Sequence, residues 1–167
     1  MSSTTGVESE RVGEALLLLD IATDFRRNGW PDKARRFARR ALAIVERESG
    51  TDHPDGVRVL LCLAGAREDL ADYARAEAEY LRADDILGRL DDTSSLEVQR
   101  LRIQTTRGLA NVAHAMGRDS QAETMLEHAL SMAERTFGGE QTDVAGVLND
   151  LGVHYRRTGK TRRTATR

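Results

Sequence analysis

The chain has 167 residues, of which 40% are hydrophobic and 31% are charged, and its formal net charge is −2 at pH 7. This length and composition fit one soluble helical domain of ordinary size. The nearly balanced charge gives no general reason to expect nucleic acid or an anionic membrane as a partner.

The ends and the apolar runs of the sequence indicate the compartment. The N-terminal segment MSSTTGVESE is polar and acidic, unlike a signal peptide. The longest apolar run, residues 15–19, is much shorter than the roughly 20 residues that cross a bilayer. Cys62 is the only cysteine, so no disulfide forms within the chain. We therefore predict a cytoplasmic protein without a membrane contact.

Hydrophobic periodicity predicts helices joined by short turns along most of the chain. Asp55 and Asp143 stand at the starts of two of them as candidate caps. The two end segments, 1–7 and the basic 159–167, are expected to be disordered. The predicted helices span residues 8–28, 31–48, 55–70, 73–90, 95–116, 119–136 and 142–158.

The segment DYARAEAEY, residues 72–80, shows how such a helix would pack. Tyr73, Ala76, Tyr80 and Ala83 are spaced three, four and three residues apart, so they form one stripe on a helix. The stripe alternates large and small side chains. It favours a close neighbouring helix whose bulky residues lie over the alanines.

The alanines of this segment belong to a repeat that covers the chain. Three positions of the first 50 residues recur 42 residues later and again 46 residues after that, as Ala22, Ala64 and Ala110, as Ala34, Ala76 and Ala122, and as Ala41, Ala83 and Ala129. A small residue also follows the first helix of each unit, at Gly29, Ala71, Gly117 and Gly159. These residues predict a turn between two helices in every unit.

The repeated residues resemble the tetratricopeptide repeat. Its pattern has a small residue and then an aromatic residue in the first helix, a glycine at the turn, and alanine, an aromatic residue and alanine in the second helix. The first unit supplies Ala22, Phe25, Gly29, Ala34 and Ala41. The 42-residue period is similar to that of the longer kinesin-light-chain repeat, which bacterial proteins also contain, rather than the common 34-residue repeat. The pattern is broken where Arg67, Ala113, Asp119 and Leu126 replace aromatic residues.

This resemblance implies an all-α, right-handed α-solenoid of antiparallel helix pairs. It implies three units and a seventh helix that caps the last one. The expected units are residues 8–50, 51–92 and 93–138, followed by the helix at 142–158.

The resemblance also implies where a ligand would bind, because the first helix of each pair lines the concave face of such a solenoid. The lysine and asparagine that clamp chaperone termini in some members are replaced here by Leu19 and Thr23, so we do not expect chaperone binding. Arg107 or Arg156 would pair with a carboxylate of an extended peptide. The expected groove residues are Thr23, Arg26, Arg58, Cys62, Glu68, Gln104, Arg107, Asn111, His114, Asn149, Asp150 and Arg156.

Other candidate chemistry is weak in this sequence. RTGKT at 157–161 lacks the spacing and the preceding strand of a phosphate-binding loop. No metal-binding spacing links the four histidines, which we interpret as surface or packing residues, and Cys62 has no paired base. We expect no metal, no cofactor and no catalytic residue. The sequence favours a non-enzymatic scaffold for a peptide or protein partner; the alternatives are a ligand-responsive regulatory sensor and a homodimer formed through the last helix.

Overall fold

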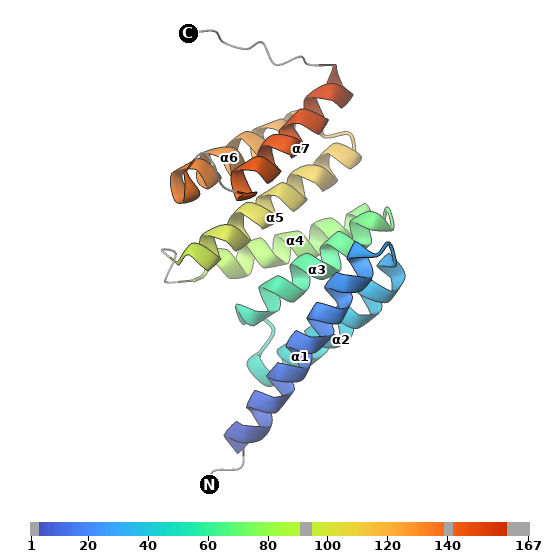
Figure 1. Ribbon diagram of the computed structural model, residues 1–167, viewed down its shortest axis with the longest axis vertical. Coiled ribbons are helices and arrows are strands. Elements are labelled where there is room, and N and C mark those ends of the chain that lie inside the picture. The colour runs from blue at the N-terminus through green and yellow to red at the C-terminus, as the bar shows by residue number, and fades with distance from the viewer. Residues whose placement is uncertain (1–3, 91–94, 139–141, 160–167) are drawn as a thin grey trace. The chain divides into compact units, whose positions relative to one another are not determined.

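The computed structural model describes residues 4–90, 95–138 and 142–159, with side chains from residue 11 onward. Within these ranges the chain forms seven α-helices and no strand (Figure 1). None of these helices combines the length and the apolar character needed to cross a membrane. The helices are α1 (Thr4–Arg27), α2 (Pro31–Ser49), α3 (Asp55–Asp69), α4 (Tyr73–Gly88), α5 (Leu96–Ala115), α6 (Asp119–Phe137) and α7 (Thr142–Thr158).

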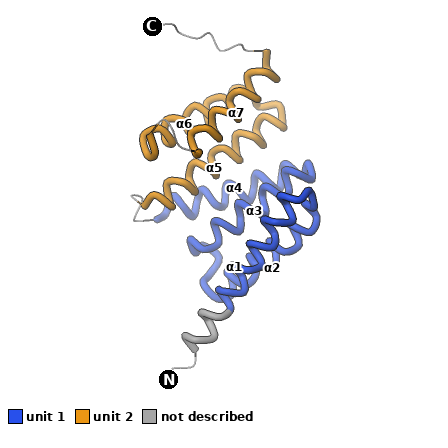
Figure 2. Tube along the Cα trace, viewed as in Figure 1, with its two compact units in different colours: residues 1–91 blue, residues 92–167 orange. Residues whose placement is uncertain are grey.

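The helices form two compact units (Figure 2). Unit 1, residues 1–91, contains α1 to α4, and unit 2, residues 92–167, contains α5 to α7. Within unit 1, α1 packs against α2 and α3, and α3 packs against α2 and α4. Within unit 2, α5, α6 and α7 all contact one another. First helices of successive repeats are therefore neighbours inside each unit.

The helix boundaries confirm the periodicity, with one correction at the N-terminus. α1 begins at Thr4, four residues before the predicted start. Once a helix has formed, each residue added to its end gains one backbone hydrogen bond, so a polar segment can extend the helix. The expected disorder therefore does not hold for residues 4–7, while 1–3 and 160–167 lie outside the described residues.

The turns inside the helix pairs have the predicted geometry. Gly29 and Gly117 have φ of 76° and 79°, and Ala71 has the same left-handed conformation at 57°. Gly159, which follows the last helix, has φ of 68°. After α3, Asp72 N–H donates to the Arg67 carbonyl at 2.9 Å and Ala71 N–H donates to the Glu68 carbonyl at 2.8 Å. These two bonds make a Schellman turn.

The predicted aspartate caps are wrong. α3 begins at Asp55, after Pro54 in the capping position, and Asp55 N–H donates to His53 Nδ1 at 3.2 Å. α7 begins one residue before Asp143. Both carboxylates lie in the first turn, where the partial positive charge of the helix end favours them without a capping bond.

The core of unit 1 explains the alternating stripe of DYARAEAEY. Ala76 and Ala83 are fully buried, Tyr80 is 5% exposed, and Tyr73 is half-buried. Leu60 and Leu63 of α3, the neighbouring helix, are also buried. The small alanines allow the close approach that the sequence predicted.

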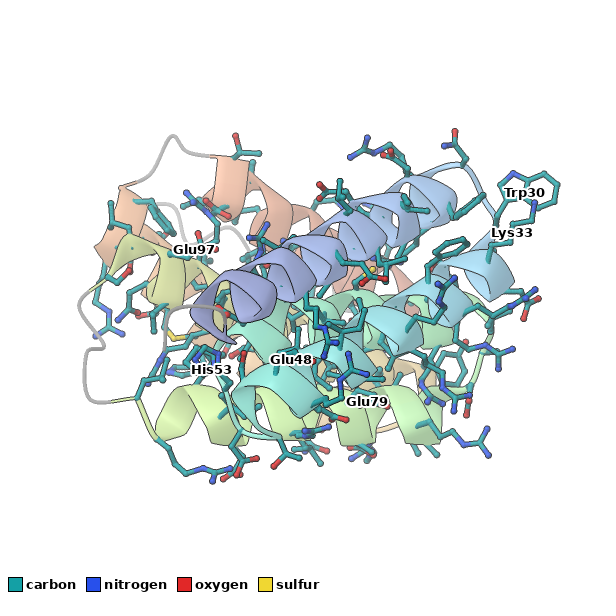
Figure 3. All side chains as sticks on the ribbon, turned by 90° about the horizontal axis from the view of Figure 1, so that it is seen from below. Trp30, Lys33, Glu48, His53, Glu79 and Glu97 are labelled. Atoms are coloured by element: carbon teal, nitrogen blue, oxygen red, sulfur yellow. The ribbon has the colours of Figure 1, made fainter. Side chains whose placement is uncertain are left out.

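The turn between α1 and α2 carries an exposed aromatic contact at the edge of unit 1. Trp30, the only tryptophan, is 55% exposed, and Lys33 Nζ lies 4.3 Å from the centroid of its ring (Figure 3). A cation over an indole face is a favourable contact. This contact holds the exposed Trp30 ring beside the start of α2.

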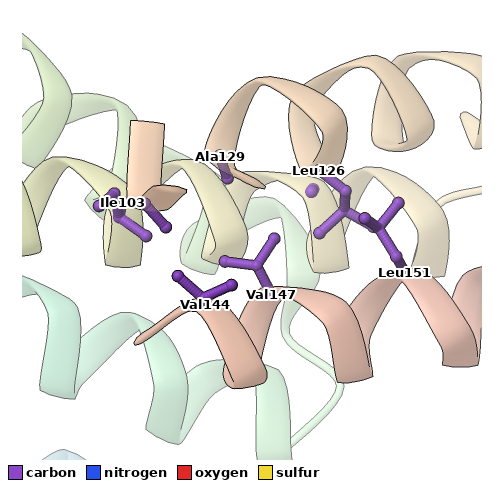
Figure 4. Packing of buried hydrophobic residues seen from close by; sticks show 8 residues of the cluster. Ile103, Leu126, Ala129, Val144, Val147 and Leu151 are labelled. Carbon is purple, nitrogen blue, oxygen red and sulfur yellow. The ribbon is translucent and has the colours of Figure 1, made fainter. Parts of the chain in front are cut away.

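The core of unit 2 lies between its three helices (Figure 4). Ile103 comes from α5, Leu126 and Ala129 from α6, and Val147 and Leu151 from α7, all of them buried. Burying such side chains is the main favourable contribution to folding. α7 therefore contributes directly to the core of unit 2.

Candidate functional site

The predicted groove residues lie on the first helices of the repeats, in two groups. The unit 1 patch, on α1 and α3, comprises Thr23, Arg26, Arg58, Cys62 and Glu68. The unit 2 patch, on α5 and α7, comprises Gln104, Arg107, Asn111, His114, Asn149, Asp150 and Arg156. Because α1 contacts α3 and α5 contacts α7, each patch is one surface of its own unit.

Arg26 is the centre of the unit 1 patch. Its Nε donates to Asp69 Oδ2 at 2.7 Å, so α1 is tied to α3. The guanidinium lies directly over Gly65, where an added Cβ would be 2.4 Å from Arg26 Cζ. Glycine at this position is what lets the arginine lie across the neighbouring helix.

Arg107 repeats this arrangement in the unit 2 patch. Its Nε donates to Asp150 Oδ2 at 2.6 Å, from α5 to α7. A Cβ on Gly146 would lie 2.8 Å from Arg107 Nη1. In both units the arginine is followed by glycine 39 residues later and by aspartate 43 residues later. The Arg107 charge that was expected to meet a ligand carboxylate is thus paired with a carboxylate of the chain itself.

Three other members of the unit 1 patch have partners within the unit. The Tyr80 hydroxyl donates to Glu68 Oε2 at 2.5 Å. Thr23 Oγ1 donates to the Leu19 carbonyl at 2.9 Å and lies 3.8 Å from Cys62 Sγ. Burial raises the pKa of the Cys62 thiol, which keeps it protonated and poorly nucleophilic.

The remaining polar residues of the two patches face solvent. Arg58 in unit 1 and Arg156 in unit 2 are exposed, and neither forms an ion pair with another described residue. The amides Gln104, Asn111 and Asn149 are exposed as well. These five side chains are available to donate hydrogen bonds to a ligand.

His114 lies at the end of the unit 2 patch, near the turn from α5 to α6. Its Nδ1 is 2.5 Å from Asp119 Oδ1, the first residue of α6. The buried His154 of α7 approaches it edge to face, with ring centroids 5.1 Å apart. Two histidines and an aspartate from three helices therefore meet at one place.

The family of the chain follows from a comparison with family models. The model of the tetratricopeptide repeat matches residues 13–87 and 101–163, which is most of the sequence. The chain belongs to the tetratricopeptide repeat family. The repeats of this family generally serve as protein–protein interaction scaffolds and typically not as enzymes. The comparison with curated proteins found no match.

Solved structures confirm the helical-repeat fold of the kinesin-light-chain type. BtubC (BKLC) from P. vanneervenii is 23% identical, with a TM-score of 0.71 over 87% of this chain and 57% of BtubC. The TPR-like repeats of a putative kinesin light chain from Podosopora anserina are 17% identical, with a TM-score of 0.74 over 89% of this chain and 69% of theirs. A TPR-like protein from Chlorobium tepidum is 19% identical, with a TM-score of 0.70 over 87% of this chain and 97% of that protein. The chain thus spans little more than half the length of BtubC.

Asp69, Gly65, Gly146, Asp119 and His154 are site residues that the sequence analysis did not select. The tetratricopeptide repeat pattern held a signal for some of them. The shared 39- and 43-residue spacings relate the two arginines to their glycines and aspartates, and Asp119 replaces an expected aromatic residue. His154 carries no such signal, because its packing against His114 depends on the position of α7.

Proposed function

We propose that this tetratricopeptide repeat protein is a non-enzymatic scaffold that binds acidic segments of a protein partner on the first helices of each unit. The observation that carries the proposal is that Arg58 on the unit 1 patch and Arg156 on the unit 2 patch are exposed and form no ion pair within the described part of the chain. We infer a cytoplasmic partner from the reducing location that the lone cysteine favours.

The arginines that form ion pairs within the chain have a different role from Arg58 and Arg156. Arg26 and Arg107 are held by Asp69 and Asp150, so they shape the surface and carry little net charge to a ligand. An exposed guanidinium without a carboxylate partner offers a bidentate site for a ligand carboxylate. The exposed amides Asn111 and Asn149 would donate to and accept from the backbone of an extended peptide.

Selection from a random peptide library, displayed on phage and exposed to the immobilised full chain, tests the proposal. We expect enriched peptides that share acidic residues and bind in solution by fluorescence anisotropy. Arg58→Glu should raise the Kd of peptides that bind the unit 1 patch about tenfold or more, and Arg156→Glu should do the same for peptides that bind the unit 2 patch, since each removes a charge-assisted hydrogen bond.

Matched charge reversals on second helices provide the control. Arg36 on α2 and Arg135 on α6 are exposed, so Arg36→Glu and Arg135→Glu change the net charge equally without altering the patches. They should leave Kd within about twofold. Equal losses in all four variants would mean non-specific electrostatic attraction, and no enriched peptide would refute peptide binding.

Self-association through α7 is the second candidate function. Leu148 on this helix is 41% exposed although its neighbour Val147 is fully buried in the core of unit 2. An exposed leucine beside Asn149 would suit a modest interface with a second copy of the chain. The ligand-responsive sensor remains a prediction from the sequence.

A further inference from the structure

His154 of α7 is a buried histidine that lacks hydrogen-bond partners among the residues that the structure describes. The residue is 2% exposed, and both ring nitrogens, Nδ1 and Nε2, are inaccessible to solvent and have no partner in residues 4–90, 95–138 and 142–159. A neutral imidazole always carries one N–H donor and one lone pair, and buried polar groups are nearly always satisfied. Something beyond ordinary packing is therefore needed to account for this side chain.

Two side chains close to the His154 ring are good metal ligands. His114 and Asp119 each offer a ligand atom, and with one nitrogen of His154 these three atoms lie within 4.8 Å of one another. His114 is 16% exposed at its side chain and Asp119 is 49% exposed, so an ion can reach the cluster from solvent. The three residues come from α5, α6 and α7 of the same unit.

We propose that His114, Asp119 and His154 form a binding site for a divalent transition-metal ion of the zinc type. Two imidazoles and one carboxylate suit zinc, cobalt or nickel, whereas magnesium and calcium require mainly oxygen ligands. Coordination by a lone pair of His154 satisfies a buried nitrogen that otherwise has no partner.

The geometry requires only small side-chain movements. Neighbouring ligands around tetrahedral zinc are about 3.4 Å apart, as follows from bonds of about 2.1 Å. The three ligand atoms lie within 4.8 Å of one another, and His114 Nδ1 lies 2.5 Å from Asp119 Oδ1. Rotation of the exposed Asp119 carboxylate and of the His114 ring would bring all of these distances to the tetrahedral value. With three protein ligands, the fourth position is left for water.

A metal ion here would fasten the last helix to the preceding pair. His114 lies at the end of α5, Asp119 at the start of α6 and His154 near the end of α7. One ion would thus bridge all three helices of unit 2 beside the patch that contains His114. This role does not require a bound peptide.

Titration of the full chain, without a polyhistidine tag and after removal of metals with a chelator, tests the site. We expect isothermal titration to show one zinc ion per chain and Co²⁺ to give the visible absorption of a tetrahedral or five-coordinate site. Magnesium should not compete. Zinc at 100 times its Kd should raise the Tm of the chain by about 5 °C or more, because only the folded state holds the assembled site.

Three ligand variants and one control identify the residues. His114→Ala, Asp119→Asn and His154→Asn should each weaken zinc binding at least about tenfold and abolish the cobalt spectrum. His128→Ala removes an exposed histidine of α6 and should change neither. Should His154→Asn fail to fold, the exposed Asp119→Asn still decides the question. Unchanged affinity in Asp119→Asn and His114→Ala, equal binding of magnesium, or no binding of zinc would overturn the proposal.

Discussion

Replacing Ala71 by glycine should stabilise unit 1, although the same change in a helix destabilises it. Ala71 has φ of 57° in the turn between α3 and α4, where the other helix-pair turns have glycine. A residue with a Cβ pays about 1 to 2 kcal/mol in this left-handed region. Ala71 is exposed, so its methyl group contributes little packing that the variant would lose.

The expected gain is smaller than this strain, because glycine also increases the entropy of the unfolded chain. That effect costs about 0.4 to 1 kcal/mol. Ala71→Gly should therefore raise the free energy of unfolding by roughly 0.5 to 1 kcal/mol. Ala78→Gly, at an exposed position inside α4, should lower it by about 1 kcal/mol.

Urea unfolding followed by circular dichroism and by fluorescence of Trp30 measures both changes. Trp30 is the only tryptophan and lies in unit 1 with both substitutions, so its signal reports on the unit concerned. The two variants should differ by about 1.5 to 2 kcal/mol with opposite signs relative to the wild type. Destabilisation by both substitutions would refute the argument that the left-handed turn governs Ala71.

Three further predictions concern other contacts. Burial and the Glu68 carboxylate raise the pKa of Tyr80 above its ordinary 10.0, so its stabilising contribution is present below about pH 10 and is lost as pH rises further. In urea titrations at alkaline pH, the free energy of unfolding should fall less steeply with pH in Tyr80→Phe than in the wild type. Equal slopes would contradict this. In Gly146→Ala the new Cβ displaces the Arg107 guanidinium. The free energy of unfolding should change little, because the gain in helix propensity of about 1 kcal/mol and the loss of the ion pair nearly cancel. The Arg107 Nε–H NMR signal should shift, and an unmoved signal would show that the new methyl group and the guanidinium coexist. If α7 forms a homodimer, light scattering should give twice the mass of the chain, and Leu148→Asp should restore the single mass; a wild-type monomer at every concentration would exclude this interface.

The fold could be predicted from the sequence because its determinants are local. Ala34, Ala76 and Ala122 recur in register, and each occupies a buried position in its second helix. Glycines mark the pair turns, and even the exception at Ala71 adopts the same backbone conformation. The caps at Asp55 and Asp143 were mispredicted because neighbouring residues decide where the first helical turn starts, and this varies by one or two positions.

The site could be predicted only in part, because its chemistry depends on contacts between repeats. The resemblance placed Arg26 and Arg107 on the first helices, but their pairing with Asp69 and Asp150 depends on which side chains meet across two helices. The histidines were interpreted from sequence spacing alone. His114 and His154 are 40 residues apart, and no short motif spans that distance.

The two arginine–aspartate pairs have a consequence for how fast a charged partner arrives. At a distance beyond about 8 Å in physiological salt, an approaching molecule senses only net local charge. Arg26 beside Asp69 and Arg107 beside Asp150 are close to neutral in this respect. Within the unit 1 patch the Glu68 carboxylate offsets the charge of Arg58, so long-range attraction comes from Arg156. The association rate of an acidic peptide should therefore depend on ionic strength as if only the unit 2 patch carried one positive charge.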